Sequence, residues 1–232
     1  ILILYTLRLG EDGDRDYELW MDRCEDTARQ WQGDAPYPFL QCEIAWVKAI
    51  VLERQSRHEE ALVLLQKAIA DYLEKDNGDR NPFYGYLYLV AAYTCCKIQV
   101  YDLMLHYTQK GLAMCEDLNL VGSELYYNLY HNVGFYHILE QNWGEAEKLY
   151  SSCIRDIEER YGKENENYAI YMGQLVCIAL RQGKDVNFFN EIKCIKDEKL
   201  RKKVKVAFVN ELNEVIGNGQ SISDIQKTYR KC

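Results

Sequence analysis

The chain has 232 residues, of which 48% are hydrophobic and 28% are charged, so it has the composition of a folded globular protein. Its net charge of −8 argues against general nucleic-acid binding, because such binding needs a basic surface.

No apolar run approaches about 18 residues, so we expect no membrane contact through a spanning helix. Residues 1–5 are apolar, but this run is short and no basic segment leads it, so we expect no signal peptide and a cytoplasmic location. The chain begins without a Met, so we also expect it to belong to a longer protein that carries an effector domain.

Apolar residues recur at helical spacing along nearly the whole chain, and clusters of Gly, Asp, Asn and Pro interrupt them. The clearest interruption covers residues 76–82, where Pro82 suits the first turn of the following helix. Only three prolines occur in the chain, as expected where long helices dominate. The pattern predicts helices over residues 1–9, 15–31, 37–55, 58–75, 82–98, 101–117, 123–140, 143–161, 165–182, 185–197, 200–216 and 221–230.

The helical pattern repeats itself weakly with a period of about 42 residues, which is typical of stacked helical hairpins. Four segments align on this period: residues 43–71, 86–114, 128–157 and 170–197. A small residue that lets two helices approach recurs at Ala49, Ala92, Gly134 and, less well, Val176. A second position, twelve residues further on, reads Ala61, Met104, Ala146 and Phe188. We expect the large side chains of Met104 and Phe188 to fit a tight hairpin poorly.

The second helices of two hairpins, EEALVLLQKAIADY (59–72) and GEAEKLYSSCIRDIEERYG (144–162), resemble those of the tetratricopeptide repeat family. The resemblance covers about residues 40–200. Its period is about eight residues longer than the usual ~34, and the proline that closes each repeat is absent. Longer repeats of this kind are similar to those of kinesin light chains and to the sensor regions of bacterial transcription regulators. The residues that carry the resemblance are Ala49, Ala61 and Ala68 in one repeat and Gly134, Ala146 and Tyr150 in another.

The resemblance implies an all-α fold, a right-handed superhelical solenoid of about five to six helical hairpins. It implies one domain over residues 1–232, with the best-defined repeats at 43–199. Residues 1–42 and 200–232 would then be degenerate or capping repeats. In the family, the first helix of each hairpin lines a concave surface.

Carried over by position, that concave surface is the predicted binding site for a peptide or protein partner. Asn128 and Asn132 lie four residues apart on one helix face, and their carboxamides could pair with a peptide backbone. The alternative is that these asparagines only make polar contacts with solvent. The predicted partner-binding residues are Trp46, Arg54, Tyr86, Tyr93, Lys97, Asn128, His131, Asn132, Phe135, Gln174 and Arg181.

Two tyrosine clusters, residues 83–88 and 126–130, allow two interpretations. Tyrosines at helical spacing can fill the interface between neighbouring repeats. They can also form a recognition surface, because tyrosine makes contacts at low entropic cost. A basic segment, residues 193–205, is interpreted as a solvated helix face because acidic residues interrupt it.

The sequence predicts no catalytic residue, no metal site and no cofactor. Its four histidines show no metal-ligand spacing with each other or with a cysteine. The nine cysteines are odd in number, form no CxxC motif and lie among apolar residues, so we interpret them as buried thiols in a reducing compartment. Paired carboxylates such as Glu164 and Glu166 fall at helix ends, where the helix dipole explains them.

We therefore expect a non-catalytic module that binds a protein or a peptide, as the sensor or scaffold part of a larger bacterial regulator. One alternative is a constitutive scaffold or a self-association module, which would form a homo-oligomer. Another is a regulatory domain that binds or inhibits an enzyme partner. This segment is not expected to bind nucleic acid directly.

Overall fold

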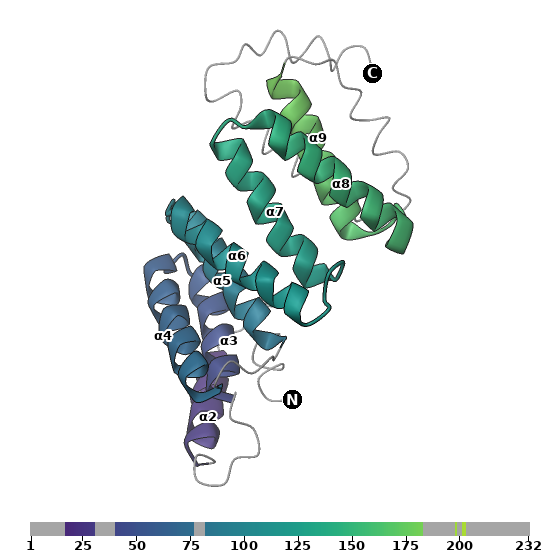
Figure 1. Cartoon of the computed structure of the whole chain (residues 1–232). Helices are drawn as coiled ribbons and strands as arrows, with labels where there is room; N and C mark the ends of the chain where they lie inside the picture. Colours follow the sequence, from purple (N-terminus) through teal and green to yellow (C-terminus); the bar gives the residue numbers. More distant parts are fainter. Residues whose placement is uncertain (1–16, 31–39, 77–81, 183–197, 199–200, 203–232) are drawn as a thin grey trace. The chain divides into compact units, whose positions relative to one another are not determined.

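A computed structural model describes residues 17–30, 40–76, 82–182, 198 and 201–202, and these residues are helical or lie in turns, without a strand among them (Figure 1). The fold is therefore all-α over the described part of the chain, as the sequence predicts. Among the helices that the structure describes, none is long and apolar enough to cross a membrane. The helices are α2 (Tyr17–Gln30), α3 (Leu40–Arg54), α4 (His58–Asp76), α5 (Phe83–Lys97), α6 (Tyr101–Asp117), α7 (Glu124–Leu139), α8 (Trp143–Tyr161) and α9 (Glu166–Arg181).

Each of these helices begins and ends within three residues of a helix predicted from the apolar pattern. The predicted helices at 1–9, 185–197 and 221–230 lie outside the described residues. So do Phe188 and most of the basic segment at 193–205. Of the predicted helix at 200–216, only residues 201 and 202 are described, and both are helical.

The chain divides into two compact units, residues 1–121 and residues 122–232, and each is described by itself. In the first unit, α2 packs on α3, α3 pairs with α4, and α5 pairs with α6. The two hairpins meet where α4 and α3 contact α5. The predicted close-packing positions Ala49, Ala61 and Ala92 are fully buried in this unit. Met104 is fully buried as well, so a hairpin of this unit accommodates the large side chain that the sequence suggested would fit poorly.

The hairpin turns of the chain share one conformation, in which a residue with positive φ follows the end of a helix. Ser56, Gln99 and Gln141 have φ values of 59°, 61° and 58° and follow α3, α5 and α7. At each turn the next residue's amide bonds back to a carbonyl five residues earlier, for example Asn142 N to His137 O at 2.8 Å. This is the Schellman pattern, which closes a helix by satisfying its last carbonyl groups.

The second unit is built around α7, α8 and α9, each of which contacts the other two. Its core contains a cluster of tyrosines, among which Tyr127, Tyr150 and Tyr171 are at most 1% exposed. Their hydroxyl groups donate to neighbouring helices: Tyr150 to the carbonyl of His131 at 3.2 Å, and Tyr171 to the carbonyl of Tyr127. Of the predicted tyrosine cluster at 126–130, Tyr127 therefore packs between helices, against Tyr171 of α9.

Candidate functional site: exposed aromatic side chains and an asparagine-lined cavity

In the first unit, aromatic side chains of α3 and α5 come together on the first helices of two hairpins. The ring of Trp46 packs edge-on against Phe83 at 5.5 Å and Tyr86 at 6.3 Å, measured between ring centroids. Tyr86 is 41% exposed, and Tyr93, two turns further along α5, is 49% exposed. The structure thus brings the predicted residues Trp46 and Tyr86 into contact and leaves part of their aromatic surface exposed.

Tyr93 forms a cation–π pair with Lys97, whose ammonium nitrogen lies 5.0 Å from the ring centroid. A hydrogen bond with Tyr93 raises the pKa of Lys97, and this effect outweighs the opposing effect of burial. Lys97 therefore stays charged at neutral pH. Arg54 lies exposed in the last turn of α3.

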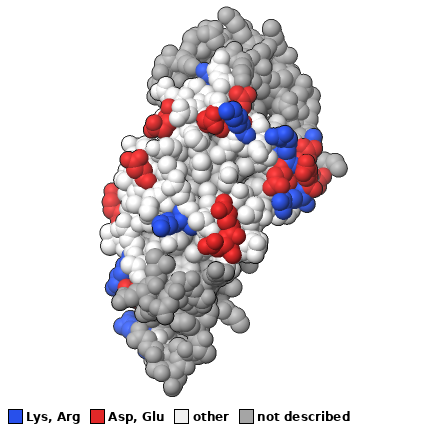
Figure 2. All heavy atoms as spheres, viewed as in Figure 1, with Lys and Arg blue, Asp and Glu red and all other residues white. Residues whose placement is uncertain are grey.

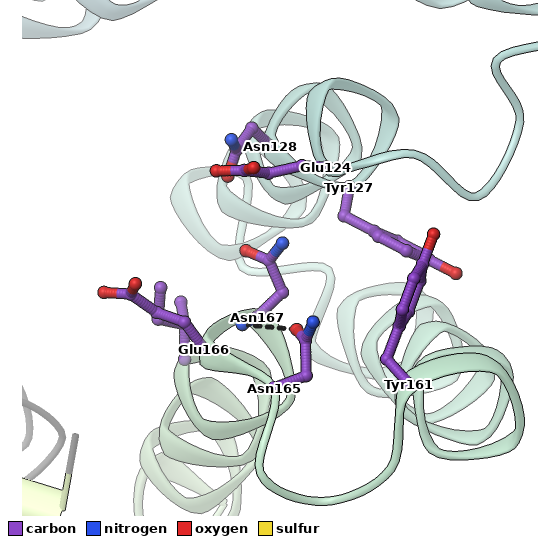
Figure 3. Close-up of a pocket in the computed structure, with 8 residues that line it drawn as sticks. Glu124, Tyr127, Asn128, Tyr161, Asn165, Glu166 and Asn167 are labelled. Atoms are coloured by element: carbon purple, nitrogen blue, oxygen red, sulfur yellow. Dashed lines mark hydrogen bonds between the residues drawn. The ribbon is translucent and has the colours of Figure 1, made fainter.

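In the second unit, a cavity of about 470 Å³ opens where the N-terminal turns of α7 and α9 meet the C-terminal turn of α8 (Figure 3). This volume is within the range of sites that bind small ligands or a few peptide residues. We call it the α7–α9 cavity. Its lining residues are Glu124, Tyr127, Asn128, Tyr161, Asn165, Glu166, Asn167 and Ile170.

Helix caps and one tyrosine hydrogen bond fix the positions of the segments that line the α7–α9 cavity. The Ser123 hydroxyl caps α7 by accepting from Tyr126 N at 3.2 Å. The Asn165 side chain plays the same part for α9, accepting from Asn167 N at 2.9 Å. Gly162 ends α8 with a φ of 78°, and the Tyr161 hydroxyl then donates to the Gly122 carbonyl at 2.7 Å. The cavity is thus framed by two capped helix starts and one fixed tyrosine ring.

Three asparagines line the cavity: Asn128 on α7, Asn165 directly before α9 and Asn167 in the first turn of α9. Asn167 is only 7% exposed, and Figure 3 shows its carboxamide directed between α7 and α9. Neither this carboxamide nor that of Asn128 hydrogen-bonds to another described residue. A carboxamide carries two donors and an acceptor, and both of these side chains offer them to the cavity. The arrangement is therefore suited to a ligand that offers both donors and acceptors, as a peptide backbone does.

The other end of the cavity is aromatic. Figure 3 shows the rings of Tyr127 and Tyr161 together, away from the carboxylates of Glu124 and Glu166. The Tyr127 hydroxyl donates to Asp156 Oδ2 at 2.5 Å. Burial, together with this hydrogen bond, raises the pKa of Tyr127. The phenol therefore stays protonated at neutral pH and acts as a structural donor.

The remaining predicted residues of α7 lie outside the lining of this cavity. His131 packs against the rings of both Tyr150 and Tyr171, at centroid distances of 5.8 and 5.9 Å. Burial lowers the pKa of His131 to about 4, so its imidazole is neutral at pH 7. The Nδ2 atom of Asn132 is buried without a hydrogen-bond partner among the described residues, and Phe135 is half-buried.

On α9, Gln174 is half-buried, and the guanidinium of Arg181 lies over the ring of Trp143, 5.5 Å from its centroid. Of the residues predicted for this unit, the structure places only Asn128 in the cavity. The sequence analysis missed Asn165 and Asn167. Their signal was an Asn-x-Asn pattern directly before a predicted helix, which can supply a cap and a second carboxamide together.

The thiols of the described residues are largely buried, as the sequence predicts. Six of the seven described cysteines are buried and none forms a disulfide. Burial raises the pKa of Cys95 and of Cys115 to about 11 and that of Cys153 to about 12. Such thiols carry little thiolate at neutral pH, and thiolate is the nucleophilic form. Among the described residues there is also no group of three or more His, Cys, Asp or Glu that could hold a metal ion.

On the face that Figure 2 shows, acidic and basic side chains lie interspersed, and most of the described surface between them is uncharged. Several charged side chains of the second unit are paired, such as Arg160 with Asp156 at 2.7 Å and Lys148 with Glu145 at 2.7 Å. Exposed pairs of this kind contribute little to stability.

No family model matches the sequence, and a search of curated proteins gives no match. Among solved structures, the fold is similar to that of BtubC (BKLC) from P. vanneervenii, with a TM-score of 0.57. The alignment covers 90% of this chain and 77% of that chain, at 13% sequence identity. At this identity the likeness concerns the fold alone, and it supports a helical-repeat architecture for this chain.

Proposed function

We propose that this chain is a non-catalytic module that binds an extended peptide segment of a partner protein. The observation that carries the proposal is the α7–α9 cavity, where the buried carboxamide of Asn167 faces into an open space without a partner among the described residues. Although Asn167 is only 7% exposed as a residue, its carboxamide is thus offered to the cavity. A peptide backbone, with its alternating donors and acceptors, would satisfy both Asn167 and Asn128.

The chemistry of the described side chains supports binding over catalysis. The thiols are held protonated by burial, and His131 is held neutral in the tyrosine core. A general base near neutral pH needs a pKa close to 7, whereas the pKa of His131 is lowered to about 4. The cavity lining consists of carboxamides, phenols, carboxylates and one isoleucine, and all of these suit recognition.

The finer architecture belongs to the same proposal. The 42-residue period, the recurring hairpin turns and the likeness to BtubC (BKLC) favour a solenoid of long tetratricopeptide-like repeats. In such a solenoid the first helices α3, α5, α7 and α9 would face the partner. We propose further that the chain serves as the sensor or scaffold part of a larger bacterial regulator in the cytoplasm, and that a bound peptide biases an attached effector element.

A scaffold function is the second candidate, and the aromatic side chains on the first unit favour it. Trp46, Tyr86 and Tyr93 present exposed or half-exposed rings on α3 and α5. Tryptophan and tyrosine are enriched among residues that dominate protein–protein binding energy. A folded partner or a second copy of the chain could dock there, independently of the α7–α9 cavity.

Selection from a random peptide library displayed on phage, with calorimetry on the enriched peptides, tests the proposed function. We expect related sequences to be enriched, and the double variant Asn128→Ala/Asn167→Ala to lose roughly tenfold or more in affinity, because two hydrogen-bonding groups are removed. The matched control is Gln109→Ala, which removes an exposed carboxamide from α6. Unchanged affinity in the double variant, with unchanged circular dichroism, would refute the assignment of this cavity.

A further inference from the structure

The α7–α9 cavity is acidic at one end, and this bears on what it recognises. Among its eight lining residues, two are carboxylates, Glu124 and Glu166, and none is Lys, Arg or His. Both glutamates are exposed, in the first turns of α7 and α9. The neighbouring cations are engaged elsewhere, since Arg160 pairs with Asp156 at 2.7 Å and Lys163 with Glu158 at 3.2 Å.

The acidic end of the cavity offers two kinds of hydrogen-bond acceptor, carboxylate oxygens and a carboxamide oxygen. Asn128 lies one turn after Glu124 on α7, a spacing that puts the two side chains on the same helix face, and Figure 3 draws both at this end of the cavity. The carboxylate of Glu166 points to the same side of the cavity, away from the tyrosine rings (Figure 3). Glu124 makes no ion pair with another described residue. A planar donor with several N–H groups can therefore reach a carboxylate and a carboxamide oxygen at once.

We propose that the α7–α9 cavity binds an arginine side chain of an extended peptide, with the guanidinium at Glu124 and Asn128 and the peptide backbone at Asn167. This inference rests on the proposed function and adds the identity of the recognised residue. Arginine fits better than lysine, because a guanidinium offers a rigid fork of donors whereas an ammonium is a compact point charge. The tyrosine end of the cavity then accepts an apolar neighbour of that arginine.

The position of Asn167 distinguishes the α7–α9 cavity from a simple acidic surface patch. Two glutamates at helix starts are by themselves explained by the helix dipole. The dipole does not explain a carboxamide that is only 7% exposed and is directed into the same cavity. A ligand with a backbone and a cationic side chain satisfies both features with one occupant.

The test uses two blocked amino acids of nearly the same shape: N-acetyl-arginine N-methylamide and its neutral citrulline isostere, in which a carbonyl oxygen replaces one NH2 group of the guanidinium. Each is titrated at millimolar concentration into the ¹⁵N-labelled full chain, and the side-chain amide signals of Asn128 and Asn167 are followed by NMR. We expect the arginine compound to bind about tenfold more tightly than the citrulline compound at low salt, as for a charge-assisted hydrogen bond. Added salt should reduce the difference.

Glu124→Gln should abolish the preference for arginine. The matched control is Glu145→Gln, which removes another exposed glutamate from the first turn of a helix, α8, outside the cavity. It should keep the full preference. Equal binding of both compounds at Asn128 and Asn167 would overturn the arginine inference and leave the peptide site standing. No shift of these signals with either compound would overturn both.

Discussion

The packing of α7 against α8 depends on the absence of a side chain at Gly134, and adding one methyl group there tests the hairpin. A Cβ atom on Gly134 would lie 2.7 Å from the hydroxyl oxygen and 2.8 Å from Cε1 of Tyr150. Tyr150 is fully buried, and its hydroxyl donates to the His131 carbonyl at 3.2 Å. The ring therefore cannot yield without losing contacts in the core of the second unit.

The expected magnitude combines three effects. Overpacking a core costs about 1–3 kcal/mol. Displacing the Tyr150 hydroxyl forfeits a hydrogen bond worth about 1 kcal/mol. Against these, Ala stabilises a helix interior by about 1 kcal/mol relative to Gly. Gly134→Ala should therefore lower the free energy of unfolding by about 1–3 kcal/mol, or the Tm by several degrees.

Gly173→Ala provides the matched control, because it makes the same change inside α9 where a Cβ would meet nothing within 4 Å. It should stabilise the protein by up to about 1 kcal/mol. Urea unfolding followed by circular dichroism measures both variants. The second variant Tyr150→Leu should remove most of the penalty at Gly134, as a double-mutant cycle would show. Equal stabilisation by both alanines would refute the close contact between α7 and Tyr150.

Two further predictions concern pH and the hairpin turns. Burial lowers the pKa of His131 from 6.5 to about 4, so between these values the unfolded state binds a proton that the folded state does not. The free energy of unfolding should fall by about 3 kcal/mol as the pH falls from 6.5 to 4. Urea titrations at several pH values should show a smaller loss in His131→Gln. The control His106→Gln, which changes an exposed histidine, should show the full loss. Gln141 has a φ of 58°, so Gln141→Gly should stabilise the protein by about 0.5–1 kcal/mol, whereas Gln109→Gly inside α6 should cost about 1 kcal/mol. A fall in Tm for Gln141→Gly, or an unchanged pH slope in His131→Gln, would contradict the respective argument.

The helices could be predicted from the sequence because their signals are local. Apolar spacing, the Pro82 start and the glycine-rich breaks act over a few residues, and tertiary packing did not override them. The small-residue positions were predictable for a related reason. Ala49, Ala92 and Gly134 repeat at one period because each lies where a first helix is closely packed.

The cavity could not be predicted in the same way, because its lining is assembled from three segments. Asn128 comes from α7, Tyr161 from the end of α8, and Asn167 from the start of α9. Their approach depends on buried contacts such as Tyr171 to the Tyr127 carbonyl, between residues 44 positions apart. His131 shows the converse difficulty, since its polarity suggested a surface position although tyrosine rings surround it.

The recurring turns share a backbone conformation that their residue types do not reveal. Ser56, Gln99 and Gln141 are separated by 43 and 42 residues and share a left-handed backbone conformation, although glycine is the residue usually chosen for it. Their chemical differences hide the period from a comparison of residue types. Because no glycine enforces the conformation, the packing of each hairpin and the hydrogen bond that closes each helix must hold it. What recurs at these turns is therefore a local packing geometry, which tolerates a serine or a glutamine at the turn and a buried methionine at Met104. These packing positions do not fix the residues at the starts of α7 and α9 or at the end of α8, and the lining of the α7–α9 cavity comes from these segments.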